Sequence, residues 1–79
     1  MLHELNNADK LVGAKQAKRA LNDGRAKKLF LAVDADPRVT EPLAALASEK
    51  SVPVVEVSSM KDLGTACGIA VGSAVAVLL

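Results

Sequence analysis

The sequence contains little of the chemistry on which most enzymes and metal sites depend. It has one cysteine, Cys67, and one histidine, His3, in 79 residues. A single cysteine excludes a disulfide within the chain and a zinc site built from several cysteines, and it favours a reducing compartment. A Cys–His dyad or a metal pair would require these two residues to meet, so we interpret Cys67 as structural.

Tryptophan and tyrosine are absent, and the one phenylalanine, Phe30, lies in an apolar run. Recognition of single-stranded nucleic acid by stacking on aromatic side chains is therefore not expected. No apolar run approaches the roughly 20 residues that span a membrane, and the start of the chain lacks the cationic and apolar segments of a signal peptide. We expect a cytoplasmic protein that does not bind a membrane.

What the sequence does contain is enough for one folded domain over residues 1–79. Hydrophobic residues make up 51% of the chain, which argues against a disordered state. A chain of this length buries roughly 60% of the surface that it exposes when unfolded, so its core is small. No repeat, linker or low-complexity tract divides it.

Apolar segments and helix signals alternate along the chain. The predicted elements are, in order, a short helix within 2–9, a strand over 10–13, a helix over 14–22, a strand over 28–33, a helix containing 43–47, a strand over 53–57, a short helix from 59 to 68, and a strand over 71–79 interrupted by Gly72 and Ser73. This alternation predicts an α/β domain with a mixed, mainly buried sheet.

Turn and cap residues set the ends of these helices. Gly24 suits the left-handed position that ends the helix over 14–22. Thr40 or Asp36 is the expected N-cap of the following helix, with Pro42 near its first turn. Ser59 and a carboxylate three residues later have the spacing of a capping box, so they begin the short helix.

The helix over 14–22 is unusual because it begins with cations. Its small apolar residues recur at helical spacing, and the opposite face carries Lys15, Lys18, Arg19 and Asn22. The first turn of a helix favours acids, yet no acid precedes Asp23. The pattern predicts a bound anion, with phosphate the natural candidate, although an ordinary solvated helix face remains an alternative.

Charge is distributed unevenly, although the formal net charge is only +1. Residues 10–28 contain a single acid, Asp23, and the following cations: Lys10, Lys15, Lys18, Arg19, Arg25, Lys27 and Lys28. We therefore expect one end of the molecule to be basic. Such asymmetry favours a polyanion site of limited size.

Two carboxylates, Asp34 and Asp36, follow the apolar strand over 28–33. Catalytic carboxylates occur at such positions in α/β folds, which leaves a small-molecule or phosphoryl-transfer module open as an alternative. A helix cap and a turn residue explain the pair more simply. The segment around Gly13 lacks the second glycine and the Gly-Lys-Ser/Thr run of a Walker loop. No catalytic residue, metal site or cofactor is predicted.

Three segments together carry a resemblance to a known family. They are Gly13-Ala14-Lys15-Gln16 through Arg19, then Ala35-Asp36-Pro37, and then Ser59-Met60-Lys61-Asp62-Leu63-Gly64-Thr65-Ala66-Cys67-Gly68-Ile69. In this order and spacing they resemble the ribosomal protein L7Ae family, and most closely its short bacterial members. The resemblance covers nearly the whole chain.

The resemblance implies a three-layer α/β/α sandwich with a mixed four-stranded sheet. It also implies a monomeric, non-enzymatic protein that binds structured RNA with a kink-turn, a bent internal loop flanked by sheared G·A pairs, and ribosomal RNA is one such partner. The implied major-groove residues are Gly13, Lys15, Gln16 and Arg19, and the implied covering loop over an extruded nucleotide is Glu56, Val57, Ser58, Ser59 and Met60. Archaeal and eukaryotic members carry Asn-Glu in place of Lys15-Gln16, and Lys in place of Arg19.

The residue chemistry is compatible with this assignment. Arg19 can donate twice to guanine O6 and N7, and Gln16 both donates and accepts, so either can read a base edge. Lys15 and Lys18 suit phosphates as point charges. A second alternative is a protein-interaction domain whose basic end meets an acidic partner.

Overall fold

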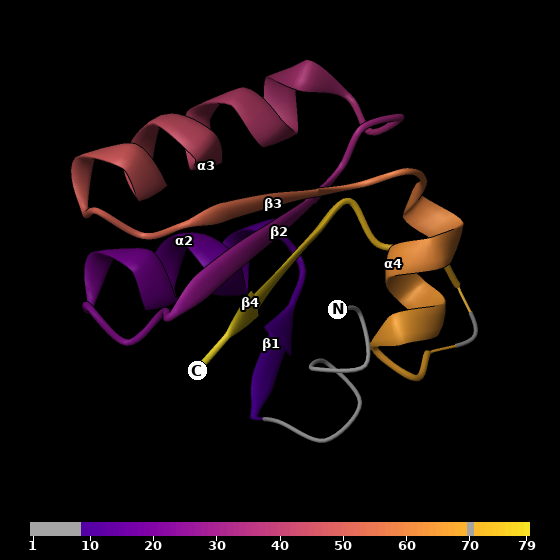
Figure 1. The fold of residues 1–79 in the computed structure, drawn as a ribbon, viewed down its shortest axis with the longest axis horizontal. Coiled ribbons are helices and arrows are strands. Elements are labelled where there is room, and N and C mark those ends of the chain that lie inside the picture. The colour runs from indigo at the N-terminus through magenta and orange to yellow at the C-terminus, as the bar shows by residue number, and fades with distance from the viewer. Residues whose placement is uncertain (1–8, 70) are drawn as a thin grey trace.

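A computed structural model describes residues 9–69 and 71–79, in which four strands and three helices alternate (Figure 1). The elements are β1 (Lys10–Val12), α2 (Ala14–Asn22), β2 (Lys28–Ala32), α3 (Pro37–Glu49), β3 (Val54–Val57), α4 (Met60–Ala66) and β4 (Val75–Leu78). The short helix expected within 2–9 lies outside the described residues, apart from Asp9, which is not helical.

The sheet is mixed and has the strand order β1-β4-β2-β3. β4 runs antiparallel to both β1 and β2, with Leu78 opposite Lys10 on one side and Lys28 on the other. β2 and β3 are parallel, with Phe30 opposite Val55. β1, β2 and β3 therefore point in the same direction, and β4 enters between them from the opposite end.

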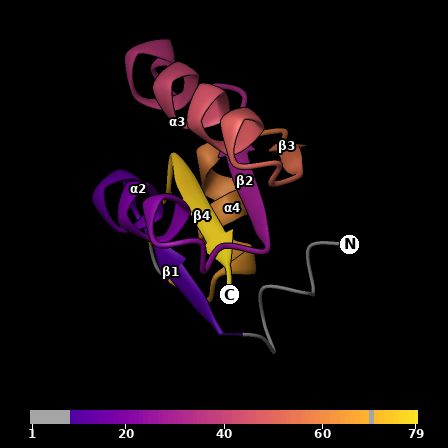
Figure 2. The ribbon, with the colours of Figure 1, turned by 90° about the vertical axis from the view of Figure 1, so that its left-hand side faces the viewer.

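Helices cover both faces of the sheet, so the molecule has three layers. α2 and α3 lie on one face and α4 on the other (Figure 2). β2 alternates between the two cores: Leu29 and Leu31 pack under α2 and α3, whereas Phe30 and Ala32 pack under α4. This arrangement confirms the α/β/α sandwich with a mixed four-stranded sheet and a β2 buried on both faces.

α3 begins after Asp36, the earlier of the two expected caps, and not after Thr40. Asp36 is the N-cap, its side chain accepts from the backbone N–H of Arg38, and Pro37 occupies the first helical position. Pro42 consequently lies inside the helix, so the expectation that it sits near the first turn is wrong. Because Pro42 is exposed, the Arg38 carbonyl that loses its helical donor can be hydrated.

β4 is shorter than expected, because the strand begins at Val75 rather than at Val71. Gly72 and Ser73 precede it, and Ser73 is buried. Its hydroxyl donates to the Val75 carbonyl over 2.7 Å, and its backbone N–H donates to the Met60 carbonyl over 3.0 Å. Ser73, the polar residue inside the apolar run, is thus hydrogen-bonded to both α4 and β4.

Candidate functional site

The carboxyl ends of β1, β2 and β3 lie at one edge of the sheet because these strands point the same way. Each strand is followed by a helix, so the first turns of α2, α3 and α4 also gather at that edge (Figure 1). Gly13, Lys15 and Gln16 therefore lie at the same edge as the residues of the implied covering loop, although about 40 residues of sequence separate them, whereas Arg19 lies in the last turn of α2.

Gly13 makes the turn from β1 into α2. Its φ of 107° lies in the region that residues with a Cβ rarely adopt, although the space around it is open. As the N-cap it offers no side-chain acceptor to the first turn of α2. Within the described residues, no side chain is seen to bond the N–H groups that open this helix.

α2 has a buried face of small residues and an exposed cationic face. Ala17, Ala20 and Leu21 are fully buried against the sheet and α3. The side chains on the other face are exposed: Lys15, Gln16, Lys18 and Arg19. The first turn holds no acid, and no described acid forms an ion pair with these cations. Their charge is therefore available to a ligand.

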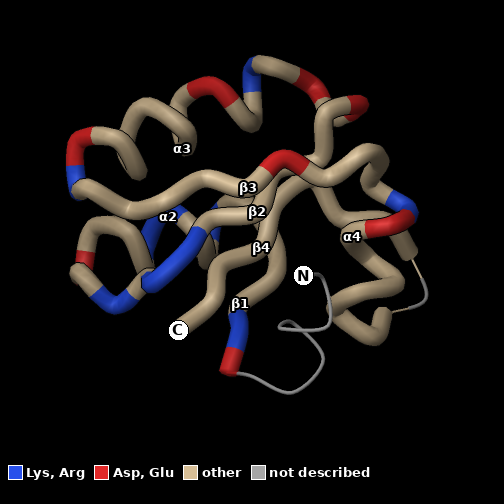
Figure 3. The backbone as a smooth tube through the Cα atoms, in the orientation of Figure 1, with Lys and Arg blue, Asp and Glu red and all other residues tan. Residues whose placement is uncertain are grey.

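The expected single basic end is divided in the structure. Lys10 and Lys28 begin β1 and β2, at the sheet edge opposite the first turn of α2 (Figure 3). Arg25 follows α2 and pairs with Asp23 over 3.4 Å. Lys15 near the start of α2 therefore lies at the opposite end of the strands from Lys10 and Lys28, whereas Arg19, in the last turn of α2, lies toward their end.

The covering loop is shorter than the resemblance implied. Glu56 and Val57 belong to β3, and Val57 is buried in the core with 3% of its surface exposed. The connection itself is Ser58 and Ser59, and Met60 is the first residue of α4, with 37% of its surface exposed. Val57 therefore cannot present its side chain to a ligand at this edge, whereas the three residues that follow it can.

Side-chain hydrogen bonds fix this connection. Ser59 caps α4 by accepting from the Asp62 N–H over 3.0 Å, which confirms the predicted cap. The Ser58 hydroxyl donates to Asp62 Oδ2 over 2.7 Å, and the Met60 N–H donates to Asp34 Oδ1 over 2.7 Å. The loop is therefore held both by its own helix and by the end of β2.

Backbone groups connect the start of α2 to this loop. The Val75 carbonyl accepts from the Gly13 N–H over 3.1 Å and from the Ser73 hydroxyl over 2.7 Å. The Ser73 N–H in turn donates to the Met60 carbonyl. Ser73 was missed as a site residue, and its one sequence signal was a hydroxyl in an otherwise apolar segment. It links the start of α2 to the start of α4.

Both carboxylates of the alternative interpretation are engaged in the structure. Asp34 accepts from the Met60 N–H, and Asp36 caps α3 and accepts from the Arg38 guanidinium. The hydrogen bonds from Arg38 lower the pKa of Asp36. Within residues 9–69 and 71–79 no cluster of three His, Cys, Asp or Glu side chains could hold a metal ion. The pair thus acts as the cap and turn residues that explain it most simply.

Cys67 is buried at the end of α4, with 6% of its surface exposed. Burial raises the pKa of its thiol, and the charge of Lys10 opposes this only in part. A buried, protonated thiol is a poor nucleophile, so the structural interpretation of Cys67 agrees with its surroundings.

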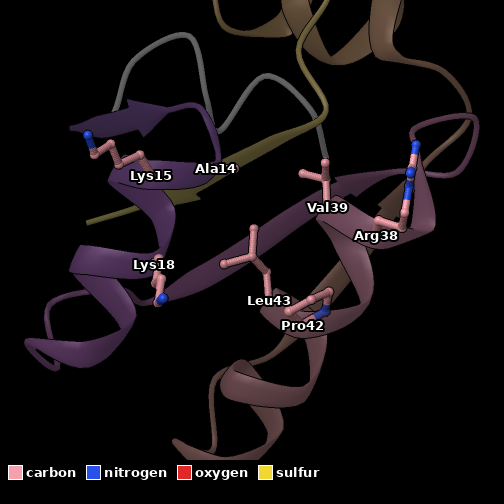
Figure 4. A pocket seen from close by; sticks show the side chains of 7 residues that line it. All are labelled: Ala14, Lys15, Lys18, Arg38, Val39, Pro42 and Leu43. Carbon is pink, nitrogen blue, oxygen red and sulfur yellow. The ribbon is translucent and has the colours of Figure 1, made fainter.

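A groove of about 290 Å³ separates α2 from α3 (Figure 4). It is lined by Ala14, Lys15 and Lys18 of α2 and by Arg38, Val39, Pro42 and Leu43 of α3. Arg38 was not among the predicted site residues, because nothing local marks an arginine after Asp-Pro as lining the same groove as Lys15. We call this feature the α2–α3 groove.

Comparisons with known proteins agree with this geometry. The chain is 46% identical over 69 residues to the RNA-binding protein YbxF of Geobacillus stearothermophilus. The aligned region covers 87% of this chain and 84% of the relative. It is 47% identical over 70 residues to an RNA-binding protein of Bacillus pumilus, covering 87% and 85%. No helix among the described residues has the length and apolar character needed to cross a membrane.

Solved structures share the fold. A 15.5 kD RNA binding protein of Giardia lamblia superposes with a TM-score of 0.87 at 32% identity, covering 98% of this chain and 65% of that one. A Bacillus halodurans protein of unknown function superposes with a TM-score of 0.88 at 25% identity, covering 98% and 81%. The profile of the ribosomal protein L7Ae/L30e/S12e/Gadd45 family matches residues 2–79. The chain belongs to this family.

Proposed function

We propose that this chain is an RNA-binding protein that recognises kink-turn RNA, and that it acts as a monomer in the cytoplasm, with ribosomal RNA among its partners. RNA binding is supported by family membership and by relatives that are named for it. The proposal assigns no catalysis to the chain, since the family and these relatives are binders rather than enzymes.

One observation carries the proposal: hydrogen bonds through Val75 and Ser73 link Gly13, at the start of α2, to Met60, at the end of the Ser58–Met60 loop. Each segment lies at the start of a helix of the fold. A surface with a helix start on one side and a short loop on the other suits an RNA that is already bent, because such an RNA is recognised by shape as well as by charge.

The residues on α2 have different roles in this proposal. Gln16 and Arg19 read the edges of guanines at the sheared G·A pairs, because their side chains are exposed and match the donors and acceptors of a base. Lys15 and Lys18 neutralise phosphates. Ser58, Ser59 and Met60 cover the extruded nucleotide.

Gel-shift titration at two salt concentrations tests these roles with three RNAs: a kink-turn hairpin, the same hairpin without its G·A pairs, and a plain duplex. We expect Gln16→Ala and Arg19→Ala each to cost about 1–3 kcal/mol on the kink-turn and little on the duplex. Lys18→Ala should weaken all three RNAs alike and lower the slope of log affinity against log salt by about one.

Asn22→Ala provides the matched control for Gln16→Ala, because it removes an exposed amide from the far end of the same helix. It should leave every affinity unchanged. A wild-type chain that binds the three RNAs equally would refute kink-turn recognition. If Gln16→Ala proved as silent as Asn22→Ala, α2 would be a diffuse basic face and the base-reading assignment would fail.

A further inference from the structure

We propose that the α2–α3 groove is part of the RNA-binding surface and that Arg38 donates to a phosphate of a strand that Lys15 and Lys18 hold from the other side. This inference rests on the proposed function and extends it, because it places a contact on α3, where neither the sequence nor the resemblance indicated one. The strand would cross from the start of α2 to the start of α3.

The groove has a cationic rim and an apolar floor. Figure 4 shows Lys15 and Lys18 on α2, Arg38 on α3, and the side chains of Val39 and Leu43 between them. No acid lines it. Charges on both sides suit the repeated phosphates of a strand.

Arg38 is both accessible and held in one orientation. Its side chain is 90% exposed, and its guanidinium bonds Asp36 through Nε at 3.2 and 3.1 Å and through Nη2 at 2.8 Å. Among the described residues nothing accepts from Nη1, so those two N–H groups are left for a ligand. A guanidinium oriented before binding loses less conformational freedom when a phosphate arrives.

The contact of Arg38 with Asp36 has a structural explanation of its own, which is the N-cap of α3. However, Asp36 caps the helix by accepting from the backbone N–H of Arg38 over 2.9 Å, and this bond does not need the arginine side chain. An exposed ion pair contributes little to folding. Loss of the side chain should therefore leave the melting temperature almost unchanged, so that any loss of affinity reports on RNA.

Continuity with α2 favours an RNA strand over other occupants. The groove shares Lys15 and Lys18 with the face that reads the kink-turn, so an RNA bound there passes directly beside it. An acidic protein segment is the other polyanion that the cationic rim could hold, and its binding is one of the outcomes below.

The test compares Arg38→Ala with Arg25→Ala on the kink-turn hairpin. Arg25 is also a surface arginine paired with an aspartate two residues away, Asp23, but it lies beyond the far end of α2, whose nine residues span about 13 Å. Both variants lose one positive charge. We expect Arg38→Ala to weaken binding about tenfold, as for a hydrogen bond to a charged group, and to lower the salt slope by about one. Arg25→Ala should change neither.

A second background separates direct contact from neutralisation of Asp36. Asp36→Asn keeps an acceptor for the α3 cap and removes the ion pair. Direct contact predicts that Arg38→Ala still costs about tenfold in this background. If Arg38 only cancels the charge of Asp36, adding Arg38→Ala to the Asp36→Asn variant will not change RNA affinity, and the inference will be overturned.

The outcomes also distinguish this inference from the proposed function. Equal losses in the Arg38 and Arg25 variants, with the wild type still preferring the kink-turn, would overturn the role of Arg38 alone. Equal binding of the wild type to all three RNAs would overturn kink-turn recognition itself. A groove that binds an acidic peptide while RNA binding survives Arg38→Ala would assign this surface to protein instead.

Discussion

Gly64→Ala is the sharpest available test of how α4 packs. Gly64 is a buried glycine in the middle of this helix. A Cβ at this position would overlap the Val71 carbonyl oxygen and would lie 3.0 Å from the Cα of Gly72. Both are backbone groups, so no side chain can rotate to make room. α4 or the segment at residues 71–72 has to move.

The expected magnitude follows from two opposing effects. Alanine is a better helix former than glycine by up to about 1 kcal/mol. Overpacking costs about 1–3 kcal/mol, and overlap with backbone belongs in the upper part of that range. The free energy of unfolding should therefore fall by about 1–2 kcal/mol. For a domain of this size, each kcal/mol lowers the melting temperature by about 4–8 °C.

Thermal and urea unfolding measure this effect, with Thr65→Ala as the control. Thr65 is exposed on the same helix, so its replacement should stabilise slightly through propensity alone. Kink-turn affinity should also fall in the Gly64 variant, because the segment that the new Cβ displaces packs closely on Met60. A Cβ built at Gly72 would lie 3.2 Å from the Met60 carbonyl oxygen, so movement of residues 71–72 should shift Met60 as well. A higher melting temperature with unchanged affinity would refute the packing argument.

Two further substitutions test buried groups, Ser73 at this edge and Cys67 at the far end of α4. Ser73→Ala should lower the free energy of unfolding by about 1 kcal/mol and no more, because the Val75 carbonyl keeps the Gly13 N–H; urea unfolding checks this, and an unchanged stability would show that the hydroxyl bond is absent. Cys67→Ala should leave RNA affinity within a few-fold, and loss of all binding by a folded variant would contradict its structural role. Because burial raises the Cys67 pKa in the folded state, wild-type stability should decline as pH rises above the ordinary thiol value of 9.0, and in Cys67→Ala this part of the decline should be missing.

The element boundaries that could be predicted from sequence are the ones that depend on local chemistry. Gly24 and Gly68 have φ values of 73° and 78°, as a residue ending a helix in the left-handed position requires. Ser59 caps α4 as its spacing predicted. These features are decided by a few neighbouring residues, so a pattern in the sequence is sufficient to find them.

The features that could not be predicted depend on where distant segments meet. Lys10 and Lys15 are five residues apart, yet one begins a strand and the other begins the helix after it, so they lie at opposite edges of the sheet. Arg38 and Ser73 became visible as site residues only through contacts with other elements. Sequence proximity indicated a single basic end, whereas strand direction decides which cations share a surface.

Strand direction brings three helix starts to this edge, and their capping groups explain why an anion site here should centre on α2. α3 receives the carboxylate of Asp36, and α4 receives the carboxylate of Asp34 and the hydroxyl of Ser59. Within the described chain, α2 alone begins without a side-chain cap and without an acid in its first turn or at its N-cap. Its partial positive charge is therefore not neutralised within the fold, and Lys15 and Lys18 increase it. A phosphate near this edge should approach α2 first, and the acids that cap α3 and α4 should direct it there.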